Sequence, residues 1–505
     1  MIAGLFTLRN IRRIYAVFFI LLFVLLLWLT GFRRMKGYET PLFLELDPLV
    51  AAASFLTSWT VYKGLVLSLF IIIGTLFFGR FFCSWICPLG IINQVAGSIF
   101  NKLRQVDAVA LNSYRSLYRL KYYILAILGA LAALGSLQIG LFDPIPLITR
   151  SFAISVFPGL NYNTGWLYLK QPLAQGGTFL GIIFFVVVFA NRFLPRFWCR
   201  AVCPLGALLG LLSLRPLFSI WRDVDRCTDC RKCLAHCHGG CDPHTALRTT
   251  ECHVCMNCIE DCPEDAIHYG LSNLSSSVHM PLDVSRRRMI ESAVAGALVF
   301  PVMRSTITSK TSPQGRVIRP PGSIKEADFL RRCIKCGECM KVCPTNAIQP
   351  ALLEAGFEGI WTPVLINKIG YCEYNCVLCS HVCPTGAITP LTVEKKLGKS
   401  AGQKPVKIGT AFYDRGRCLP WAMNIDCIVC EEVCPTSPKA IWFESVEVQL
   451  RDGAKKILKQ PRVDPRLCIG CGICENKCPI HDYPAVRVTS IGETRSPSNQ
   501  MILKS

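Results

Sequence analysis

Residues 252–263 read CHVCMNCIEDCP, and the cysteine spacing in this stretch decides the fold of the cysteine-rich half of the chain. Two residues separate each of the first three cysteines from the next, and a fourth follows three residues later with a proline behind it. Three closely spaced thiolates and a fourth from a distant run are what a four-iron cluster needs. A zinc site of four cysteines instead combines two separate Cys-x-x-Cys couples. The stretch therefore predicts a 4Fe–4S cluster rather than zinc.

Five further runs follow the same pattern, two of them without deviation and two with a longer first spacing. The six runs comprise Cys227, Cys230, Cys233, Cys237 and Cys241; Cys252, Cys255, Cys258 and Cys262; Cys333, Cys336, Cys339 and Cys343; Cys372, Cys376, Cys379 and Cys383; Cys418, Cys427, Cys430 and Cys434; and Cys468, Cys471, Cys474 and Cys478. In the first run either Cys237 or Cys241 could supply the fourth thiolate, and the spacing favours Cys237. We expect six 4Fe–4S clusters, held by α+β modules of the bacterial-ferredoxin type.

The fourth cysteine of such a run ligates the cluster of a partner run, so the six runs must pair. The runs that begin at Cys227 and Cys252 are neighbours and are expected to form one two-cluster module. For the other four runs, symmetry favours a nested arrangement in which the first pairs with the last and the second with the third. Residues 326–490 should then form one four-cluster domain.

The composition excludes several classes of protein. Of the 505 residues, 51% are hydrophobic and 18% charged, and the mean hydropathy is +0.37, which is too apolar for a disordered chain. Nearly all of the 29 cysteines lie in tight runs, whereas a disulfide scaffold is short and rarely spaces its cysteines in this way. Six or seven clusters of about −2 each would remove roughly 12 to 14 charges from the formal +21. No nucleic-acid partner is therefore expected.

The N-terminal half carries four apolar stretches, each 17–21 residues long and almost free of charge. They occupy residues 15–31, 62–82, 122–142 and 178–194. A helix of this length crosses the roughly 30 Å of a bilayer core, so residues 1–220 are expected to form an α-helical membrane domain with four spans. Basic residues precede the first stretch and follow the second, and the positive-inside rule then places the N-terminus in the cytosol, below a bacterial inner membrane.

This membrane half is a duplication. Each unit contains an Asp-Pro pair and ends in a Cys-x-x-x-Cys-Pro motif, GRFFCSWICPLG at 79–90 and PRFWCRAVCPLG at 195–206. Two spans per unit preserve orientation, so the units should be parallel repeats about an axis along the membrane normal. The two motifs contribute Cys83, Cys87, Cys199 and Cys203. These thiols have three interpretations: a seventh iron–sulfur or metal centre, structural thiols, or a docking surface for the first ferredoxin module.

The segment after the first ferredoxin module (221–275) determines where the last four clusters lie. Residues 285–325 combine a twin-arginine-like start, SRRRMIESAVAGALVFPVM at 285–303, with a linker rich in Ser, Thr, Pro and Gly. The segment either begins a fifth span that carries the four-cluster domain to the extracytoplasmic side, or is a surface or buried helix that leaves all clusters in the cytosol. The first alternative is favoured. The tail at 491–505 is expected to be disordered.

Other cofactors are not expected. No histidine lies in the four apolar stretches, which excludes a haem with two histidine ligands there. The chain has neither a G-x-G-x-x-G motif behind a strand nor a P-loop, so no NAD, flavin or nucleotide site is expected. The protein should conduct electrons as part of a larger complex, and whether it counts as an enzyme stays open.

On these motifs, residues 1–270 resemble the membrane quinol-dehydrogenase component of periplasmic nitrate reductase systems (NapH type), and are similar to its nitrous-oxide-reductase regulator and oxidase-assembly relatives. Residues 285–490 resemble the partner ferredoxin subunit (NapG type), including the Cys418-x8-Cys427 spacing and the leading arginines. The chain resembles a fusion of the two. It departs from the pattern at His238, which replaces a proline, and in the spare cysteine of that run.

The resemblance implies that the membrane half takes electrons from menaquinol or ubiquinol, and that the clusters pass them to a partner reductase or cytochrome subunit. A quinol site needs proton acceptors near the end of a span, and Asp47 and Asp143 are the symmetric candidates. Their other interpretation, which we favour, is a cap or turn before proline. The alternative function is an assembly or regulatory protein whose clusters reduce a metal or sense redox state. Four additional clusters in series favour electron transport.

Overall fold

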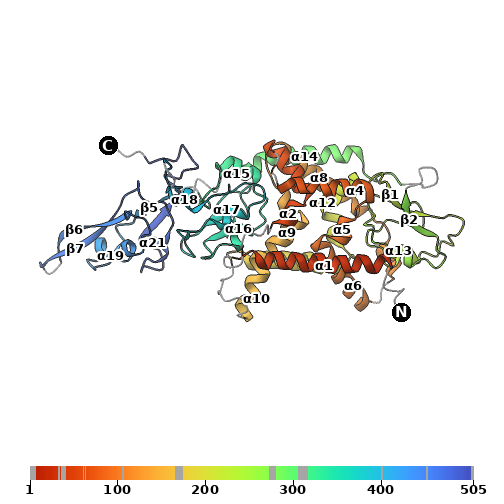
Figure 1. Ribbon diagram of the computed structural model, residues 1–505, viewed down its shortest axis with the longest axis horizontal. Helices are drawn as coiled ribbons and strands as arrows, with labels where there is room; N and C mark the ends of the chain where they lie inside the picture. Colours follow the sequence, from red (N-terminus) through yellow and green to blue (C-terminus); the bar gives the residue numbers. More distant parts are fainter. Residues whose placement is uncertain are drawn as a thin grey trace.

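The computed structural model describes residues 7–501 apart from 32–34, 36–40, 61, 63, 105–106, 165–173, 272–279, 305–316, 400–401 and 451–452. The described chain is elongated, with helices in the middle and a cysteine-rich region at each end (Figure 1). The region around residues 218–271 forms one end, and residues 318–501 form the other. The helical domain therefore separates the two cysteine-rich regions along the long axis of the molecule.

The helical domain consists of two units with the same order of elements. Each has a long helix, a helix that begins at the Asp-Pro pair, a second apolar helix, and a helix that begins at the Cys-Pro pair. In the first unit these are α1 (Leu8–Leu29), α3 (Pro48–Ser58), α4 (Ser68–Phe78) and α6 (Pro88–Arg104), with the short α2 (Leu42–Glu45) and α5 (Phe82–Trp85) between them. After α7 (Ala108–Asn112), the second unit has α8 (Leu120–Ala133), α9 (Pro144–Ser151) continued by α10 (Phe157–Thr164), α11 (Gly177–Phe189) and α12 (Pro204–Leu212). The fold thus repeats the duplication seen in the sequence.

Asp47 and Asp143 initiate the equivalent helices α3 and α9 by the same local chemistry. The Asp47 Oδ1 atom accepts a hydrogen bond of 2.9 Å from the N–H of Leu49, and the Asp143 Oδ1 atom accepts one of 3.3 Å from the N–H of Ile145. The proline after each aspartate occupies the start of the helix, where its missing N–H costs no hydrogen bond. The interpretation of both aspartates as helix caps is confirmed.

Two helices in the described part of the chain are long and apolar enough to cross a membrane, Leu8–Leu29 and Ala108–Ala133. Large apolar side chains also point outward from several helices. On α1 Leu21 is 63% exposed, on α4 Phe70 is 69% exposed, and on α11 Phe185 is 65% exposed. An apolar outer surface of this kind is unusual for a soluble protein.

The second and fourth apolar stretches form shorter helices than the sequence predicts. The helices that cover them, Gly64–Phe78 and Gly177–Arg192, belong to a class of 10–17 residues, so spans of the full predicted length are not found there. Gly79, at a φ of 78°, ends the first of these helices, because the chain turns there to place Arg80 in the core. An apolar run in the sequence marks burial or lipid contact, and does not by itself mark where a helix ends.

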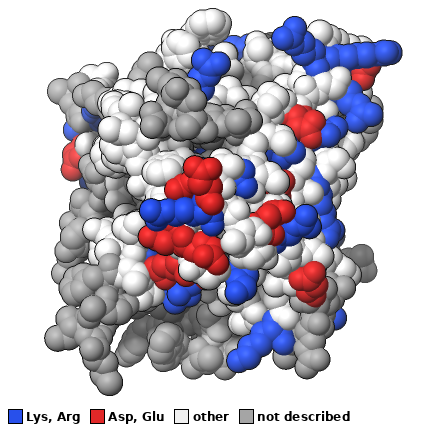
Figure 2. All heavy atoms as spheres, turned by 90° about the vertical axis from the view of Figure 1, so that its right-hand side faces the viewer, with Lys and Arg blue, Asp and Glu red and all other residues white. Residues whose placement is uncertain are grey.

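The first cysteine-rich region is a small ferredoxin-like module. Its two strands, β1 (Phe218–Arg222) and β2 (Ile267–Leu271), pair antiparallel with Ile220 opposite Tyr269, and the short α13 (Asn257–Glu260) lies between them in sequence. The outer surface at this end carries acidic and basic side chains next to one another (Figure 2). The module therefore presents a polar, mixed-charge surface at one end of the molecule.

Helix α14 (Arg286–Arg304) leads from this module back along the helical domain, where it lies beside α8 (Figure 1). A Cβ atom at Gly296 would come within 2.6 Å of the carbonyl oxygen of Ile127, so a glycine is needed for the two helices to approach this closely. Ile290 and Leu298 point away from α8 and are 66% and 71% exposed. The exposed face of α14 is therefore apolar from Val294 to Val302, whereas Arg287 and Glu291 near its start form an exposed ion pair.

The second cysteine-rich region contains three two-stranded antiparallel sheets and seven short helices among its described residues. The sheets are β3 (Ile348–Pro350) with β4 (Pro363–Leu365), β5 (Thr410–Tyr413) with β8 (Val486–Thr489), and β6 (Ile441–Gln449) with β7 (Lys455–Val463). The helices are α15 (Glu326–Arg332), α16 (Glu338–Lys341), α17 (Leu378–His381), α18 (Val393–Leu397), α19 (Leu419–Ala422), α20 (Val429–Glu432) and α21 (Ile473–Asn476). Because these helices and strands are short, each core is formed mainly by the loops and the cysteines that they carry.

Residues 491–501 of the tail that the sequence predicts to be disordered are ordered, and residues 502–505 lie outside the described residues. Glu493 is only 2% exposed and pairs with Arg495, which also pairs with Glu326 of α15. The N–H of Thr494 donates a hydrogen bond to the carbonyl oxygen of Lys407. The polar composition of residues 491–501 suggested disorder, but its charged side chains are used in ion pairs with the domain.

Candidate iron–sulfur centres

The second cysteine-rich region contains a well-defined candidate centre next to the helical domain. Cys333 and Cys336, from the loop between α15 and α16, and Cys339, from α16, line one cavity together with Cys383. The cavity wall is otherwise largely apolar, and includes Phe329, Ile334, Met340, Val382, Ala387 and Ile388. Three thiols from one run, a fourth from another and an apolar wall fit the donor set of a 4Fe–4S cluster.

The neighbouring run forms the second half of this module. Cys372, Cys376 and Cys379 all interact electrostatically with Cys343, the last cysteine of the preceding run. Each of the two runs therefore gives its first three thiols to one centre and its fourth to the other. This crossed arrangement is the one that bacterial ferredoxins use.

The two remaining runs form a further module of the same kind. Cys468, Cys471 and Cys474 line a cavity together with Cys434. The complementary set is Cys418, Cys427 and Cys430, with Cys478 as the fourth neighbour. The outermost module therefore repeats the crossed arrangement.

The nested pairing expected from symmetry is wrong. The run at 333–343 pairs with the run at 372–383, and the run at 418–434 pairs with the run at 468–478. Runs that follow one another in the sequence are joined by a loop that folds back on itself, so their thiols meet locally. The sequence could not decide between the two arrangements, because all four runs have nearly the same spacing.

In the first module, Cys233 has Cys227, Cys230 and Cys262 among its neighbours, as crossed ligation requires. The second centre contains the run at 252–258, and here two candidates for the fourth ligand are present. Cys237 interacts with Cys255 and Cys258, whereas Cys241 interacts with Cys252. The two candidate sulfurs lie only 3.5 Å apart. Both thiols therefore lie at the site.

Among the described residues, no three His, Cys, Asp or Glu side chains converge closely enough to hold a single metal ion. A zinc ion would draw four sulfurs to about 2.3 Å from one point. The cysteine sets surround a volume instead of a point. This geometry fits a multi-iron cluster rather than a mononuclear site.

The two Cys-x-x-x-Cys-Pro motifs meet in the core of the helical domain. Cys83, Cys87, Cys199 and Cys203 are all buried. Cys87 interacts with Cys199 and Cys83, and Cys203 interacts with the other three thiols. The sulfur of Cys203 also accepts a hydrogen bond of 3.2 Å from the N–H of Gly206 in the first turn of α12, where the helix dipole favours negative charge. We call these four residues the cysteine quartet.

Two arginines flank the quartet at equivalent positions of the repeat. Arg80 and Arg196 each precede the first cysteine of a motif by three residues, and they are 0% and 2% exposed. Arg80 interacts with Cys83 and Cys203, and Arg196 interacts with Cys199 and Cys83. Neither arginine was predicted from the sequence, although both motifs share an R-x-x-C spacing that marks them. Their charges would offset that of a thiolate-bound cluster.

The first ferredoxin module is docked directly onto the quartet. The indole N–H of Trp85, which lies between Cys83 and Cys87, donates a hydrogen bond of 2.9 Å to the carbonyl oxygen of Val254 in the second cysteine run. Glu251, immediately before that run, is buried and forms ion pairs with Arg80 and Lys121. The second cysteine run and the quartet are therefore adjacent.

The module at 333–383 is docked onto the opposite end of the helical domain. The Nζ atom of Lys335 donates a hydrogen bond of 2.6 Å to the side chain of Gln138, and the buried Arg150 donates one of 2.9 Å to the carbonyl oxygen of Lys335. A Cβ atom at Gly140 would lie 2.0 Å from the carbonyl oxygen of Ile334, so the backbones are in direct contact. The loop that carries Cys333 and Cys336 thus touches the helical domain.

The carboxyl groups of Asp47 and Asp143 interact directly in the core between these two docking regions. Both side chains are 0% exposed, and their Oδ2 atoms have no hydrogen-bond donor among the described residues. Two buried carboxyl groups in contact cannot readily both carry a negative charge. Asp47 and Asp143 occupy equivalent positions in the two repeat units, and the packing of these units brings their side chains together.

Comparison with known proteins supports iron–sulfur binding. A family model described as a 4Fe-4S binding domain matches residues 60–106, 176–221 and 377–400, and a second of the same description matches 330–349 and 461–481. The first model covers both Cys-x-x-x-Cys-Pro motifs. No solved structure matches the chain.

Three relatives illustrate which proteins the chain is similar to. It is 31% identical over 214 residues, 41% of this chain, to the methylamine utilization ferredoxin-type protein MauM of Methylorubrum extorquens, and covers 90% of that protein. It is 31% identical over 207 residues, 40% of this chain, to the ferredoxin-type protein NapG of Escherichia coli, and covers 84% of it. It is 32% identical over 203 residues, 39% of this chain, to the putative electron transport protein YccM of Escherichia coli, of which it spans 53%.

Proposed function

Because the chain belongs to the family of ferredoxin-type electron transport proteins that includes MauM and NapG, we propose that it is a membrane-bound polyferredoxin. In this proposal it carries electrons between the quinone pool, with menaquinol as the donor, and a partner reductase. The observation that carries the proposal is the placement of the cysteine sets: one ferredoxin module is docked at each end of the helical domain, and the quartet lies in that domain beside the first module. Six 4Fe–4S clusters would occupy the six runs.

The outward-facing apolar side chains of α1, α4, α11 and α14 support a membrane location. Lipid would cover them, whereas water would not tolerate so many exposed aromatic and aliphatic groups on one domain. The basic residues near the N-terminus favour a cytosolic first module. With α14 as a fifth crossing, the modules at 318–501 would then lie on the extracytoplasmic side.

The quartet is proposed to hold a seventh iron–sulfur centre. Four buried thiols from two motifs, two helix N-termini and two buried arginines form a site that suits a cluster of negative charge. The Nε atoms of Arg80 and Arg196 are buried and have no hydrogen-bond partner among the described residues, which an additional anionic group nearby would compensate. A centre here would link the first module to the rest of the helical domain.

Asp47 and Asp143 are proposed as the proton acceptors for quinol oxidation. Oxidation of a quinol to a quinone releases two electrons and two protons. Because the buried pair readily carries only one negative charge, it would take up one proton at a time, and the first proton has to leave the pair before the second is accepted. The pair lies in the same apolar core as the quartet. Electrons released there would have a short route to a cysteine-bound centre.

Anaerobic reduction by a quinol tests this proposal. The full chain in detergent is mixed with a menaquinol analogue, and cluster reduction is followed as bleaching of the visible sulfur-to-iron absorbance. We expect bleaching that a quinone-site inhibitor blocks. Asp143→Asn should slow it without loss of iron, because asparagine still caps a helix but cannot take up the proton. Asp107→Asn is the matched control, since Asp107 caps α7 on the surface.

Clusters that a quinol cannot reduce would contradict the proposal. If the clusters remain oxidised with quinol but bleach with a low-potential soluble donor, electrons do not enter from the quinone pool. That outcome would favour the assembly or regulatory alternative. Loss of iron in Asp143→Asn would show that this aspartate is needed for structure and would remove it as a proton acceptor.

A further inference from the structure

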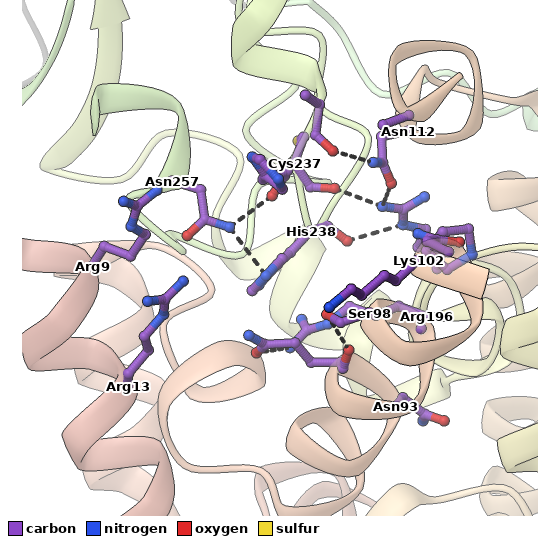
Figure 3. A pocket seen from close by; sticks show the side chains of 18 of the residues that line it. Arg9, Arg13, Asn93, Ser98, Lys102, Asn112, Arg196, Cys237, His238 and Asn257 are labelled. Atoms are coloured by element: carbon purple, nitrogen blue, oxygen red, sulfur yellow. Dashed lines mark hydrogen bonds between the residues drawn. The ribbon is translucent and has the colours of Figure 1, made fainter. Parts of the chain in front are cut away.

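A cavity of about 480 Å³ lies where the first turns of α1, the side of α6 and the first ferredoxin module meet. Figure 3 shows Arg9 and Arg13 of α1 on one side of the cavity, Lys102 of α6 on the other, and Asn257 and His238 of the ferredoxin module between them. The size is in the usual range for small-molecule sites. Two of its lining residues, Arg196 and Cys237, also belong to the candidate cluster sites, but the cavity itself has no role in the electron-transfer proposal.

The lining of the cavity is strongly basic. It contains six basic side chains and no aspartate or glutamate within the described residues; the six are Arg9, Arg12, Arg13, Lys102, Arg196 and Arg200. Arg9 forms ion pairs with Glu260 and Asp261 behind the wall. Arg12, Arg13 and Lys102 have no acidic partner in the part of the chain that the structure describes. The cavity therefore has an uncompensated positive charge.

Two of these arginines are buried with incomplete hydrogen bonding. Arg12 is 1% exposed and donates a hydrogen bond of 3.0 Å from Nη1 to Gln94, while its Nε has no partner among the described residues. Arg196 is 2% exposed, donates to Gln94 and to the carbonyl oxygen of Gly90, and its Nε is likewise unpartnered. Burying a cation without an anion is costly. The two buried arginines therefore call for an anionic partner that the described residues do not supply.

The cluster thiolates account for only part of this charge. Arg12 and Arg196 interact with Cys255, and Arg196 also interacts with Cys199 of the quartet. Arg13 and Lys102, in contrast, are exposed side chains at the mouth of the cavity, and no thiol contact is found for them among the described residues. They are placed to meet a ligand that enters from outside.

We propose that this cavity binds a phosphate-bearing anion. Arginine forks pair with phosphate oxygens through two parallel hydrogen bonds, and several converge here. The chemistry is shared by a free phosphate and by the headgroup of an anionic phospholipid. The second source is favoured, because the same helices continue from the cavity into exposed apolar residues: Ile14 on α1 is 59% exposed, and Val95 and Ile99 on α6 are each 54% exposed. Acyl chains would lie on these residues.

The test compares one variant with a control of equal charge. The variant is Arg13→Gln with Lys102→Gln, two exposed residues whose loss should not affect folding. The control is Arg226→Gln with Arg231→Gln, two exposed arginines of the ferredoxin module outside the cavity. The full chain is placed in nanodiscs of phosphatidylcholine with a minor fraction of phosphatidylglycerol, and retained lipid is counted by native mass spectrometry. Iron content and visible absorbance check that all variants hold their clusters.

We expect the wild type and the control to retain phosphatidylglycerol in excess of its share in the disc. The variant should bind it about 25-fold more weakly, since each basic residue contributes roughly a factor of five at an anionic surface. A second arm titrates inorganic phosphate into discs of phosphatidylcholine alone by calorimetry. Phosphate binding that the variant weakens, without any preference for phosphatidylglycerol, assigns the site to a free phosphate.

The proposal is overturned if the wild type neither enriches phosphatidylglycerol nor binds phosphate, or if the variant and the wild type behave alike in both arms. In that case the arginines serve to offset the charge of the neighbouring clusters. Both arms measure binding of the anion in the cavity and do not involve electron transfer. Their results are therefore independent of the quinol experiment.

Discussion

The backbone N–H of Cys372 donates a hydrogen bond of 2.8 Å to the carbonyl oxygen of Cys471. These residues belong to different ferredoxin modules, and each is a candidate ligand of a different cluster. The bond therefore joins the edge of one cluster site to the edge of the next. It makes the second cysteine-rich region a row of four sites, which begins at the helical domain and ends at the β6–β7 hairpin (Figure 1).

Gly472→Ala is expected to disturb this junction. Gly472 has a φ of 79°, and a Cβ atom there would lie 2.3 Å from the side chain of Asn367, which belongs to the neighbouring module. Backbone strain and the clash together should lower the free energy of unfolding by about 3 kcal/mol. Gly453→Ala is the matched control, because it has a φ of 84° but meets nothing within 4 Å. It should cost only about 1 kcal/mol.

Thermal unfolding of the two glycine variants measures this difference. Spin–spin coupling between reduced clusters, followed by electron paramagnetic resonance, should also weaken in Gly472→Ala and stay unchanged in Gly453→Ala. Equal destabilisation of the two variants would mean that the modules are not packed at this junction.

Double substitution of cysteines tests the pairing of the runs. Cys383→Ser and Cys336→Ser should each remove one cluster, and the double variant should still lose only one, because both residues line the same cavity. Combining Cys383→Ser with Cys376→Ser should instead remove two clusters, since Cys376 belongs to the adjacent site. Iron and acid-labile sulfide per protein give the count. Additive loss in the first pair would contradict the observed pairing.

Cys203→Ser tests the proposed seventh centre. The iron content should fall by that of one centre, at most four iron atoms per protein, and the six ferredoxin-type signals should remain, because the quartet shares no residue with the six runs. Unchanged iron in Cys203→Ser would leave the quartet as structural thiols.

The ion pairs of Glu326, which lies outside the first module, predict how the free energy of unfolding depends on pH. Burial by itself would raise the pKa of Glu326, but Arg319 and Arg495 lower it to about 2. A carboxyl whose pKa is depressed in the folded state stabilises above its ordinary value of 4.5 and loses this effect as the pH falls toward 2. Glu326→Gln should therefore cost about 1 kcal/mol near neutral pH, a modest amount because the side chain is partly exposed.

The same reasoning predicts how the effect of Glu326→Gln changes with pH. The difference in unfolding free energy between wild type and variant should be constant from neutral pH down to the ordinary pKa and should shrink at about pH 3.5. Urea unfolding at these pH values measures the difference. Any loss of clusters in acid affects the wild type and the variant alike and therefore does not change the comparison. A difference that grows in acid would contradict the ion-pair assignment.

Local chemistry could be predicted from the sequence more reliably than contacts between distant segments. The six cysteine runs, the duplication and the caps at Asp47 and Asp143 follow from spacing and residue type, and the structure contains all three. The pairing of the runs was wrong, because four runs of similar spacing do not encode which one folds back on which. Runs that follow one another along the chain pair, because the loop between them reverses the direction of the chain.

The convergence of the quartet and the roles of Arg80 and Arg196 depend on how the two repeats pack against each other. A repeat in the sequence establishes equivalent positions but not the distance between them. The shortened second helix has a similar cause, because it ends just before Arg80, which is buried in the core and pairs there with Glu251. The order of the tail was also hidden, since ion pairs such as Arg495 with Glu326 form only after folding.

Electron transfer across a sealed bilayer tests the central claim most directly. The full chain is reconstituted in quinone-free vesicles that contain a trapped electron acceptor, and a membrane-impermeant reductant is added outside. We predict that the acceptor is reduced only in vesicles with the protein, and that Cys203→Ser stops the transfer while the six ferredoxin-type clusters remain. Reduction no faster than in protein-free vesicles, with all clusters present, would contradict a continuous electron path through the helical domain.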